Sequence, residues 1–211
     1  MDLLTSFSEV SRPYHQFCGV AKALDRVGDR WTLLIVRDLL LGPRRFGELE
    51  AALAGVPPAL LTARLRELEG HGLVERPSRG LYALTPLGRE LEPVILALGR
   101  FGARWLTRPG DEDRVDLRWA MLSLMRRFSR AERDWTLVAR TDDRAWTLRF
   151  GPDGLRTQDG ADDADAEVTG SEQAWFGLLS GRVEPKLLLE SGALAVTGDV
   201  DALTALVGGL N

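Results

Sequence analysis

The side chains best suited to chemistry in the first half of this chain are arginines. A guanidinium group is permanently charged and donates two parallel hydrogen bonds, so it suits phosphate oxygens and the acceptor edge of guanine. Of the 27 basic residues, two are lysines, Lys22 and Lys186. The candidate contacts to an anionic partner are Arg44, Arg45, Arg64, Arg66, Arg76 and Arg79.

Charge is unevenly distributed along the chain, although the formal net charge is −4. Residues 1–108 contain 15 basic and 12 acidic side chains, a formal +3, whereas residues 109–211 contain 12 and 19, a formal −7. Because phosphate attracts positive charge, the N-terminal part is the one expected to approach a nucleic acid.

A short helix is predicted where Pro57-Pro58 opens residues 59–69 and Gly70 closes them. At about 100° per residue, its leucines share one side. The opposite side would face a DNA major groove, with a guanine contact from Arg66 and smaller contacts to base edges and methyl groups. Arg64 falls on the apolar shoulder, where it would position the helix through a phosphate or a carboxylate. The predicted groove-facing residues are Pro58, Ala59, Thr62, Ala63 and Arg66.

The neighbouring elements predict a winged helix-turn-helix, mainly α with a small β-hairpin. Apolar spacing indicates helices over 13–27, 30–41 and 46–53, and a hairpin over 73–76 and 81–84 whose tip carries Arg79. Thr85-Pro86 then begins a helix that is expected to run to about residue 107. Its apolar residues follow a heptad spacing that needs a partner, so we expect a homodimer. The predicted dimerisation residues are Leu91, Val94, Leu98, Phe101 and Trp105.

The amino-acid sequence of this region resembles that of the HxlR-type regulators, relatives of the MarR group, over roughly residues 14–107. The resemblance lies in Asp29-Arg30-Trp31-Thr32-Leu33-Leu34, in Gly42-Pro43-Arg44-Arg45-Phe46, in residues 57–69 and in Leu84-Thr85-Pro86-Leu87-Gly88. It implies a dimeric DNA-binding repressor or activator. The four-residue hairpin tip is shorter than the usual wing, and Ala59 stands where a basic residue is common, so wing contacts are expected to be reduced.

Residues 108–113 are turn-forming and acidic, and we interpret them as a linker between domain 1–108 and domain 114–211. The second domain is predicted to be α+β, with helices over 115–128, 172–179 and 200–207. Strands are predicted over 135–140, 145–150, 155–158, 167–169, 186–190 and 193–197. The acidic stretch 159–165 lacks the spacing of a calcium loop and is interpreted as a solvated loop.

The segments 174–185 and 191–199 resemble sterol-carrier-protein-like domains, through Gly177, Gly181 and the pair Gly192 and Gly198, in a match of about 35 residues. The resemblance implies a sheet covered by helices with an apolar cavity between them. The candidate lining residues are Trp146, Phe150, Trp175, Phe176, Leu179 and Leu187. The alternative is that these side chains fill a solid core.

Cys18 is the single cysteine and lies near the start of the first predicted helix. It resembles the thiol with which some HxlR-type proteins sense oxidants, and a helix N-terminus lowers a thiol pKa. The alternative is a small buried hydrophobic residue.

These observations together predict a transcription regulator, a repressor, that responds to an apolar small molecule. One alternative is an apolar-ligand carrier that uses the winged helix for dimerisation, and another is a thiol-based redox regulator acting through Cys18. The sequence has no phosphate-binding glycine loop, no metal-ligand spacing and no nucleophile with a base, so neither an enzyme nor a cofactor or metal is expected. No apolar run reaches a membrane-spanning length and Met1 to Val10 lack a secretory layout, so we expect a cytoplasmic protein without membrane contact.

Overall fold

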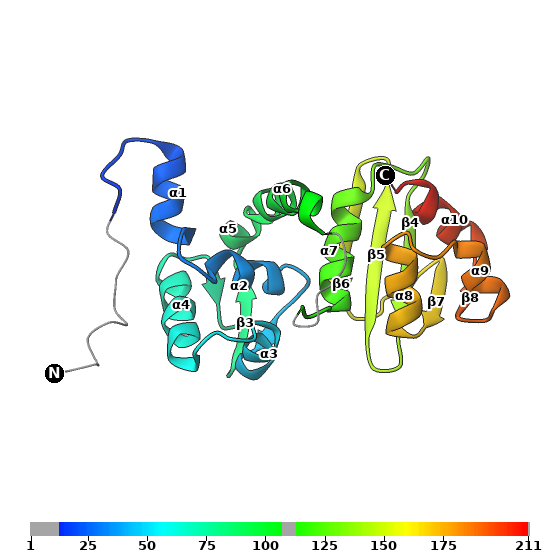
Figure 1. Cartoon of the computed structure of the whole chain (residues 1–211), viewed down its shortest axis with the longest axis horizontal. Helices are drawn as coiled ribbons and strands as arrows, with labels where there is room; N and C mark the ends of the chain where they lie inside the picture. Colours follow the sequence, from blue (N-terminus) through cyan, green and yellow to red (C-terminus); the bar gives the residue numbers. More distant parts are fainter. Residues whose placement is uncertain (1–12, 107–112, 211) are drawn as a thin grey trace. The chain divides into compact units, whose positions relative to one another are not determined.

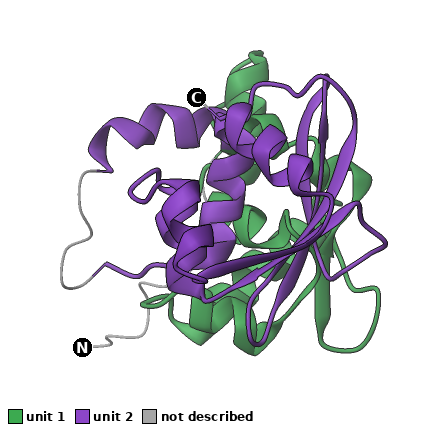
Figure 2. Ribbon diagram, turned by 90° about the vertical axis from the view of Figure 1, so that its right-hand side faces the viewer, with its two compact units in different colours: residues 1–95 green, residues 96–211 purple. Residues whose placement is uncertain are grey.

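The computed structural model describes residues 13–106 and 113–210 (Figure 1). It divides into two compact units, residues 1–95 and 96–211 (Figure 2). The predicted linker over 108–113 lies outside the described residues except for Asp113. Within the described ranges, no helix combines the length and apolar character needed to cross a membrane.

The first unit is mainly helical with one small antiparallel sheet, as predicted for a winged helix-turn-helix. Its elements are α1 (Gly19–Val27), α2 (Thr32–Leu39), β1 (Arg44–Arg45), α3 (Phe46–Ala52), α4 (Pro58–Gly70), β2 (Val74–Glu75), β3 (Leu81–Leu84) and α5 (Pro86–Arg89). The strands lie in the order β1-β3-β2, so the hairpin strand β3 is central. The short strand β1 was not predicted.

Leucine and isoleucine side chains from α2, α3 and α4 form the core of this unit. Ile35 and Leu39 of α2, Leu49 of α3 and Leu61 and Leu65 of α4 are all fully buried. Each such side chain contributes about 1.5 to 3 kcal/mol by leaving water. Because α4 is held by its leucine face, its opposite face is fixed outward.

Two helix predictions in this region need correction. The first helix begins at Gly19 rather than Pro13, and His15 has φ of 53°, which a helix cannot accommodate. The long helix expected after Thr85 is broken into α5, α6 (Glu92–Gly102) and the 3₁₀ turn η1 (Ala103–Trp105). The proline at position 93 explains the break, because its ring would clash with the carbonyl of Arg89 in a continuous helix.

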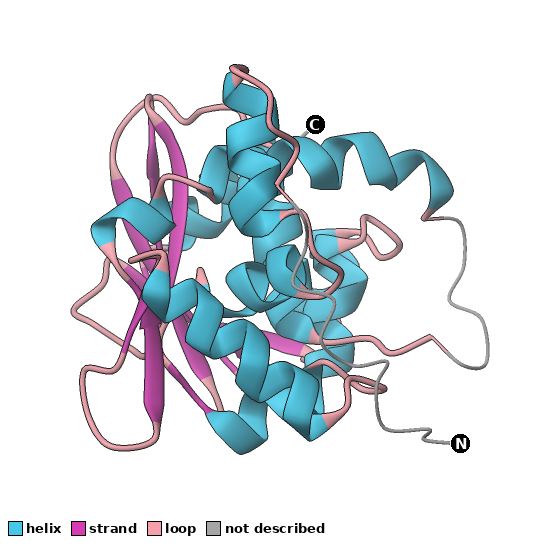
Figure 3. Ribbon diagram, turned by 90° about the vertical axis from the view of Figure 1, so that its left-hand side faces the viewer, coloured by secondary structure: helices cyan, strands magenta, loops and turns pink. Residues whose placement is uncertain are grey.

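The second unit is a five-stranded sheet with helices on one face (Figures 2 and 3). The strand order is β6-β5-β4-β7-β8, and every neighbouring pair is antiparallel except β4 with β7. Its elements are α7 (Leu117–Arg127), β4 (Trp135–Arg140), β5 (Ala145–Gly151), β6 (Gly154–Asp159), β7 (Ala166–Gly170), α8 (Glu172–Leu179), α9 (Pro185–Glu190), β8 (Leu194–Gly198) and α10 (Val200–Gly208).

The strand register places apolar and polar residues on opposite faces of this sheet. Leu148 of β5 pairs with Leu137 of β4, and both are fully buried. The buried face packs against α7, where the Thr157 hydroxyl lies 3.0 Å from the sulfur of Met125. On the other face, Arg140 of β4 forms an ion pair of 2.7 Å with Glu167 of β7.

One predicted strand in this unit is wrong, because residues 185–190 form helix α9. Glu184 is extended and Pro185 occupies the first helical position, a favoured helix start that the sequence reading missed. A short apolar run such as Leu187-Leu188-Leu189 has no period that separates strand from helix. Of this helix, only Leu188 is buried.

Candidate functional site

Helix α4 has the two faces expected from its residue spacing. Leu61, Leu65 and Leu68 are buried, whereas Ala59 and Ala63 are exposed. Pro58 stands exposed at its first turn, preceded by Pro57 in extended conformation. The outward face therefore consists of small side chains, over which another surface can approach the helix backbone closely.

Polar groups on the same face of α4 are available to a partner. Arg66 is exposed, and among the described residues no carboxylate lies within ion-pair distance of it. The Thr62 hydroxyl donates to the carbonyl of Pro58 at 2.9 Å, which leaves its oxygen able to accept a hydrogen bond. The face therefore offers a guanidinium donor and a hydroxyl acceptor beside two methyl groups.

Arg64 differs from Arg66 because its guanidinium is held inside the unit. One of its nitrogens lies 2.8 Å from Asp29 and 2.5 Å from Glu67. Of the two expected partners, a phosphate or a carboxylate, the side chain has carboxylates. It links α4 to the segment before α2 and so positions the helix.

The hairpin carries one arginine in an ion pair and one that is exposed. Arg76 pairs with Glu69 of α4 at 2.5 Å, and its guanidinium lies 4.8 Å from the ring centre of Tyr82. Arg79 lies exposed at the tip, beside Gly80 with φ of 77°. Arg79 is therefore the hairpin side chain presented to solvent without an ion pair among the described residues.

Strand β1 contains Arg44 and Arg45, and both were expected to contact an anionic partner at the surface. Arg44, opposite Tyr82, is 8% exposed and donates to the carbonyl of Glu48 at 3.4 Å. Arg45, opposite Leu81, is exposed. The expectation of a surface contact from Arg44 is corrected, because successive residues of a strand point to opposite sides.

Cys18 is exposed at the N-cap of α1. The backbone N–H groups of Ala21 and Val20 hold the pKa of its thiol below the ordinary value. The alternative of a small buried hydrophobic residue is therefore wrong for this chain.

The heptad residues of α6 and η1 present an uncovered apolar strip. Val94, Leu98, Phe101 and Trp105 are exposed, and Leu91 is half-buried. The rings of Phe101 and Trp105 pack edge to face with 5.2 Å between their centres. The strip is still present although the helix is broken before it, because α6 keeps the heptad spacing of apolar residues that the sequence predicts.

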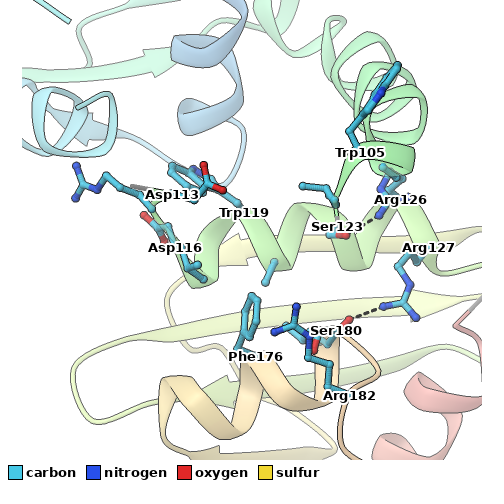
Figure 4. Close-up of a pocket in the computed structure, with 16 residues that line it drawn as sticks. Trp105, Asp113, Asp116, Trp119, Ser123, Arg126, Arg127, Phe176, Ser180 and Arg182 are labelled. Carbon is cyan, nitrogen blue, oxygen red and sulfur yellow. Dashed lines mark hydrogen bonds between the residues drawn. The ribbon is translucent and has the colours of Figure 1, made fainter. Parts of the chain in front are cut away.

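A pocket of about 640 Å³ lies in the second unit (Figure 4). It is lined by the outer side of α7, by the end of α8 and the residues after it, and by residues 103–106. Two of the predicted ligand residues, Phe176 and Leu179, line it. Trp119, Arg126 and Arg182 also line it and were not predicted from the sequence. Trp105 lines it as well, but was predicted only as a dimerisation residue.

The remaining predicted ligand residues lie elsewhere. Trp146, Phe150 and Trp175 are buried in the core between the sheet and the helices, and the indole N–H of Trp175 donates to the carbonyl of Arg140 at 3.0 Å. Leu187 is 57% exposed. Its expected inward position depended on the strand that is helix α9.

Comparison with protein families assigns both halves of the chain. Residues 26–109 match the HxlR-like helix-turn-helix family, and residues 130–211 match the SCP-2 sterol transfer family. An uncharacterized HTH-type transcriptional regulator of Synechocystis sp. is 39% identical over 101 residues, which cover 45% of this chain and 75% of the relative. The chain belongs to the HxlR-like helix-turn-helix family.

Other proteins share the HxlR-like half. An uncharacterized HTH-type transcriptional regulator of Mycobacterium tuberculosis (strain H37Rv) is 44% identical over 108 residues, 47% of this chain and 68% of the relative. The solved structure of the redox regulator HypR in its reduced form is 32% identical, covers 41% of this chain and 92% of its own, and has a TM-score of 0.39. The quinone-bound YodB of Bacillus subtilis is also 32% identical, covers 40% and 96%, and has a TM-score of 0.38. This HxlR-like chain is a transcriptional regulator of the DNA-binding helix-turn-helix class, joined to an SCP-2 domain.

Proposed function

We propose that this chain is a homodimeric repressor that inserts α4 into the DNA major groove and changes its DNA affinity when a small molecule occupies the second unit. The groove contacts are Ala59, Thr62, Ala63 and Arg66, with Pro58 at the helix start. Arg45 and Arg79 contact phosphates on either side of the groove. The effector is an apolar molecule, as the SCP-2 match suggests.

The proposal rests on the outward face of α4. Three buried leucines leave the helix no freedom to turn that face inward. Small side chains next to an unpaired arginine are the composition that reads base edges, because they let the helix lie deep in the groove while the guanidinium reaches guanine. The positive balance of residues 1–108 supports the same surface.

The dimer is supported by the apolar strip of α6 and η1. A monomer would leave Leu98 and Phe101 in water, whereas two copies bury them against each other. A symmetric pair presents two α4 helices to half-sites about 34 to 36 Å apart. The operator is therefore expected to be a palindrome.

An electrophoretic shift assay with the DNA upstream of the protein's own gene tests the proposal. The full-length protein should shift this DNA at concentrations that leave a random duplex of equal length free. Its affinity should fall steeply between 50 and 200 mM salt, since phosphate contacts release counterions. Equal binding to both duplexes, or none at low salt, would contradict the proposal and would favour the carrier alternative if apolar ligands still bind.

Regulation through Cys18 is a second candidate, supported by the exposure of the thiol and its lowered pKa. Diamide oxidises two thiols to a disulfide, so in this single-cysteine chain it should link Cys18 of two protomers. The linked wild-type protein should then have a changed DNA affinity, and Cys18→Ser should be unaffected. An equal response of both proteins would exclude this candidate.

A further inference from the structure

We propose that the pocket beside α7 binds an amphipathic organic anion, whose charged group lies at Arg126 and Arg182 and whose apolar body lies against Trp119 and Phe176. The inference deepens the proposed function and rests on it for the regulatory consequence, since it adds a charged group to the apolar effector proposed above.

The pocket lies on the side of α7 that faces away from the sheet. Met121 and Leu124 are buried toward the strands, whereas Trp119, Ser123 and Arg126 line the pocket. It is therefore distinct from the apolar space between helices and sheet that the sterol-carrier resemblance implies. Its volume of about 640 Å³ falls within the range of small-molecule sites, about 300 to 1,000 Å³.

Aromatic rings form much of the pocket wall. Trp119 comes from α7, Phe176 from α8 and Trp105 from η1, and all three are lining residues (Figure 4). Leu179 and Ala120 add apolar surface. Such walls make favourable contacts with a flat ring system or an acyl chain, but few with a small inorganic ion.

Several arginines line the pocket, and Arg126 is one of them. Arg126 is partly buried and donates to the hydroxyl of Ser123 at 2.8 Å, but no carboxylate within the described residues pairs with it. Burial lowers its pKa, and the neighbouring positive charges of Arg127 and Arg100 lower it further. An anion close to Arg126 would favour its charged form.

Arg182 is an exposed arginine that also lines the pocket. Its guanidinium lies 5.5 Å from the ring centre of Phe176, and it forms no ion pair among the described residues. A guanidinium group can donate two parallel hydrogen bonds to a carboxylate or sulfonate. Asp113 and Asp116 also line the pocket (Figure 4).

Two fluorescent dyes of similar shape test the charge requirement with the full-length protein. 8-Anilinonaphthalene-1-sulfonate carries an anion, whereas N-phenyl-1-naphthylamine is uncharged. The double substitution Arg126→Gln with Arg182→Gln should weaken binding of the sulfonate at least about tenfold, which corresponds to the loss of a charge-assisted hydrogen bond. Binding of the uncharged dye should stay unchanged. Equal affinity of the double variant and the wild-type protein for the sulfonate would overturn the proposal.

Two further variants separate this effect from general changes in charge or folding. Arg156→Gln removes an exposed arginine of β6, outside the pocket, and should leave both affinities unchanged. Trp119→Ala should weaken both dyes, since it removes part of the apolar wall. A loss with Arg156→Gln as large as that of the double variant would count against the site.

Competition in the wild-type protein requires no variant. Dodecanoate should displace the bound sulfonate dye at a concentration at least about tenfold lower than dodecan-1-ol does. Equal displacement by both would overturn the anion site. Displacement by dodecanoate without any change in the DNA shift would leave the site intact and would refute the ligand regulation within the proposed function.

Discussion

Arg66 is the side chain on which base recognition by α4 depends, because it is exposed and unpaired on the outward face. Arg66→Ala should weaken operator binding by about 1 to 3 kcal/mol and relax base preference. Arg79→Ala should weaken operator and random DNA alike and reduce the salt slope by about one. Fluorescence anisotropy with both duplexes across a salt series measures these effects. Equal losses on both duplexes with Arg66→Ala would contradict the assignment of the recognition face.

Cys18 should react as a thiolate at lower pH in the folded protein than in the unfolded chain. The backbone N–H groups of Ala21 and Val20 favour its charged form and lower its pKa. Because the folded-state pKa is depressed, ionisation favours the folded state above the unfolded pKa, and this contribution disappears as pH falls through the folded pKa. Alkylation by iodoacetamide, measured against pH in buffer and in urea, should give a lower midpoint in buffer. Coincident profiles would show that the helix terminus has no effect.

At the scale of residues, the sequence predicts burial better than it predicts contacts. The faces of α4 follow from leucine spacing alone, since a helix has a fixed period. The inward position of Arg44 depends on pairing with Tyr82, which is distant in sequence. The pocket was missed for a similar reason. Trp119 and Arg126 look like an ordinary solvent face of α7 until the chain after α8 lies beside them.

Thr85 joins the turn between α4 and β2 to α5 through two hydrogen bonds of one hydroxyl. Its oxygen accepts from the backbone N–H of Gly88 at 3.0 Å, and its O–H donates to the carbonyl of Gly72 at 2.6 Å. Thr85→Ala removes the helix cap and leaves that carbonyl without its partner, so we expect the free energy of unfolding to fall by about 1 to 3 kcal/mol.

Urea denaturation of the full-length protein measures the effect of Thr85→Ala on stability. Thr85→Ser is the matched control, because it keeps the hydroxyl and should stay within about 0.5 kcal/mol of the wild-type protein. Equal stabilities of the alanine and serine variants would show that the cap does not stabilise this junction.

At the scale of elements, the sequence predicts strong periodic segments and misses local geometry. Strands β4 and β5 and helix α8 lie within one residue of the ranges predicted from the sequence. Helix α9 was predicted as a strand because its apolar run is too short to reveal a period. The break between α5 and α6 follows from a proline in the sequence, but the continuous heptad spacing concealed its effect.

At the scale of the whole molecule, the two resemblances identified from sequence motifs are confirmed. Family matches over residues 26–109 and 130–211 assign each half of the chain separately. The charge division agrees with this assignment, since the helix-turn-helix half carries a formal +3 and the other half −7. A negative second half would be repelled by phosphate, so DNA contacts are expected from the first half alone.

The substitution Leu98→Glu tests whether the protein dimerises through α6. Leu98 is 46% exposed, so a charge there should leave the fold intact but should separate two copies by repulsion across the strip. Sedimentation velocity at micromolar concentration should show a monomer. Operator affinity should fall at least about hundredfold, because one monomer carries a single α4 helix and binds only one half-site.

The matched control for this experiment is Leu187→Glu, which places the same charge on an exposed leucine of α9, away from the strip. This variant should remain a dimer and bind the operator like the wild-type protein. A dimer that survives Leu98→Glu would place the interface elsewhere, and the two α4 helices would then require a different symmetric arrangement to reach adjacent grooves.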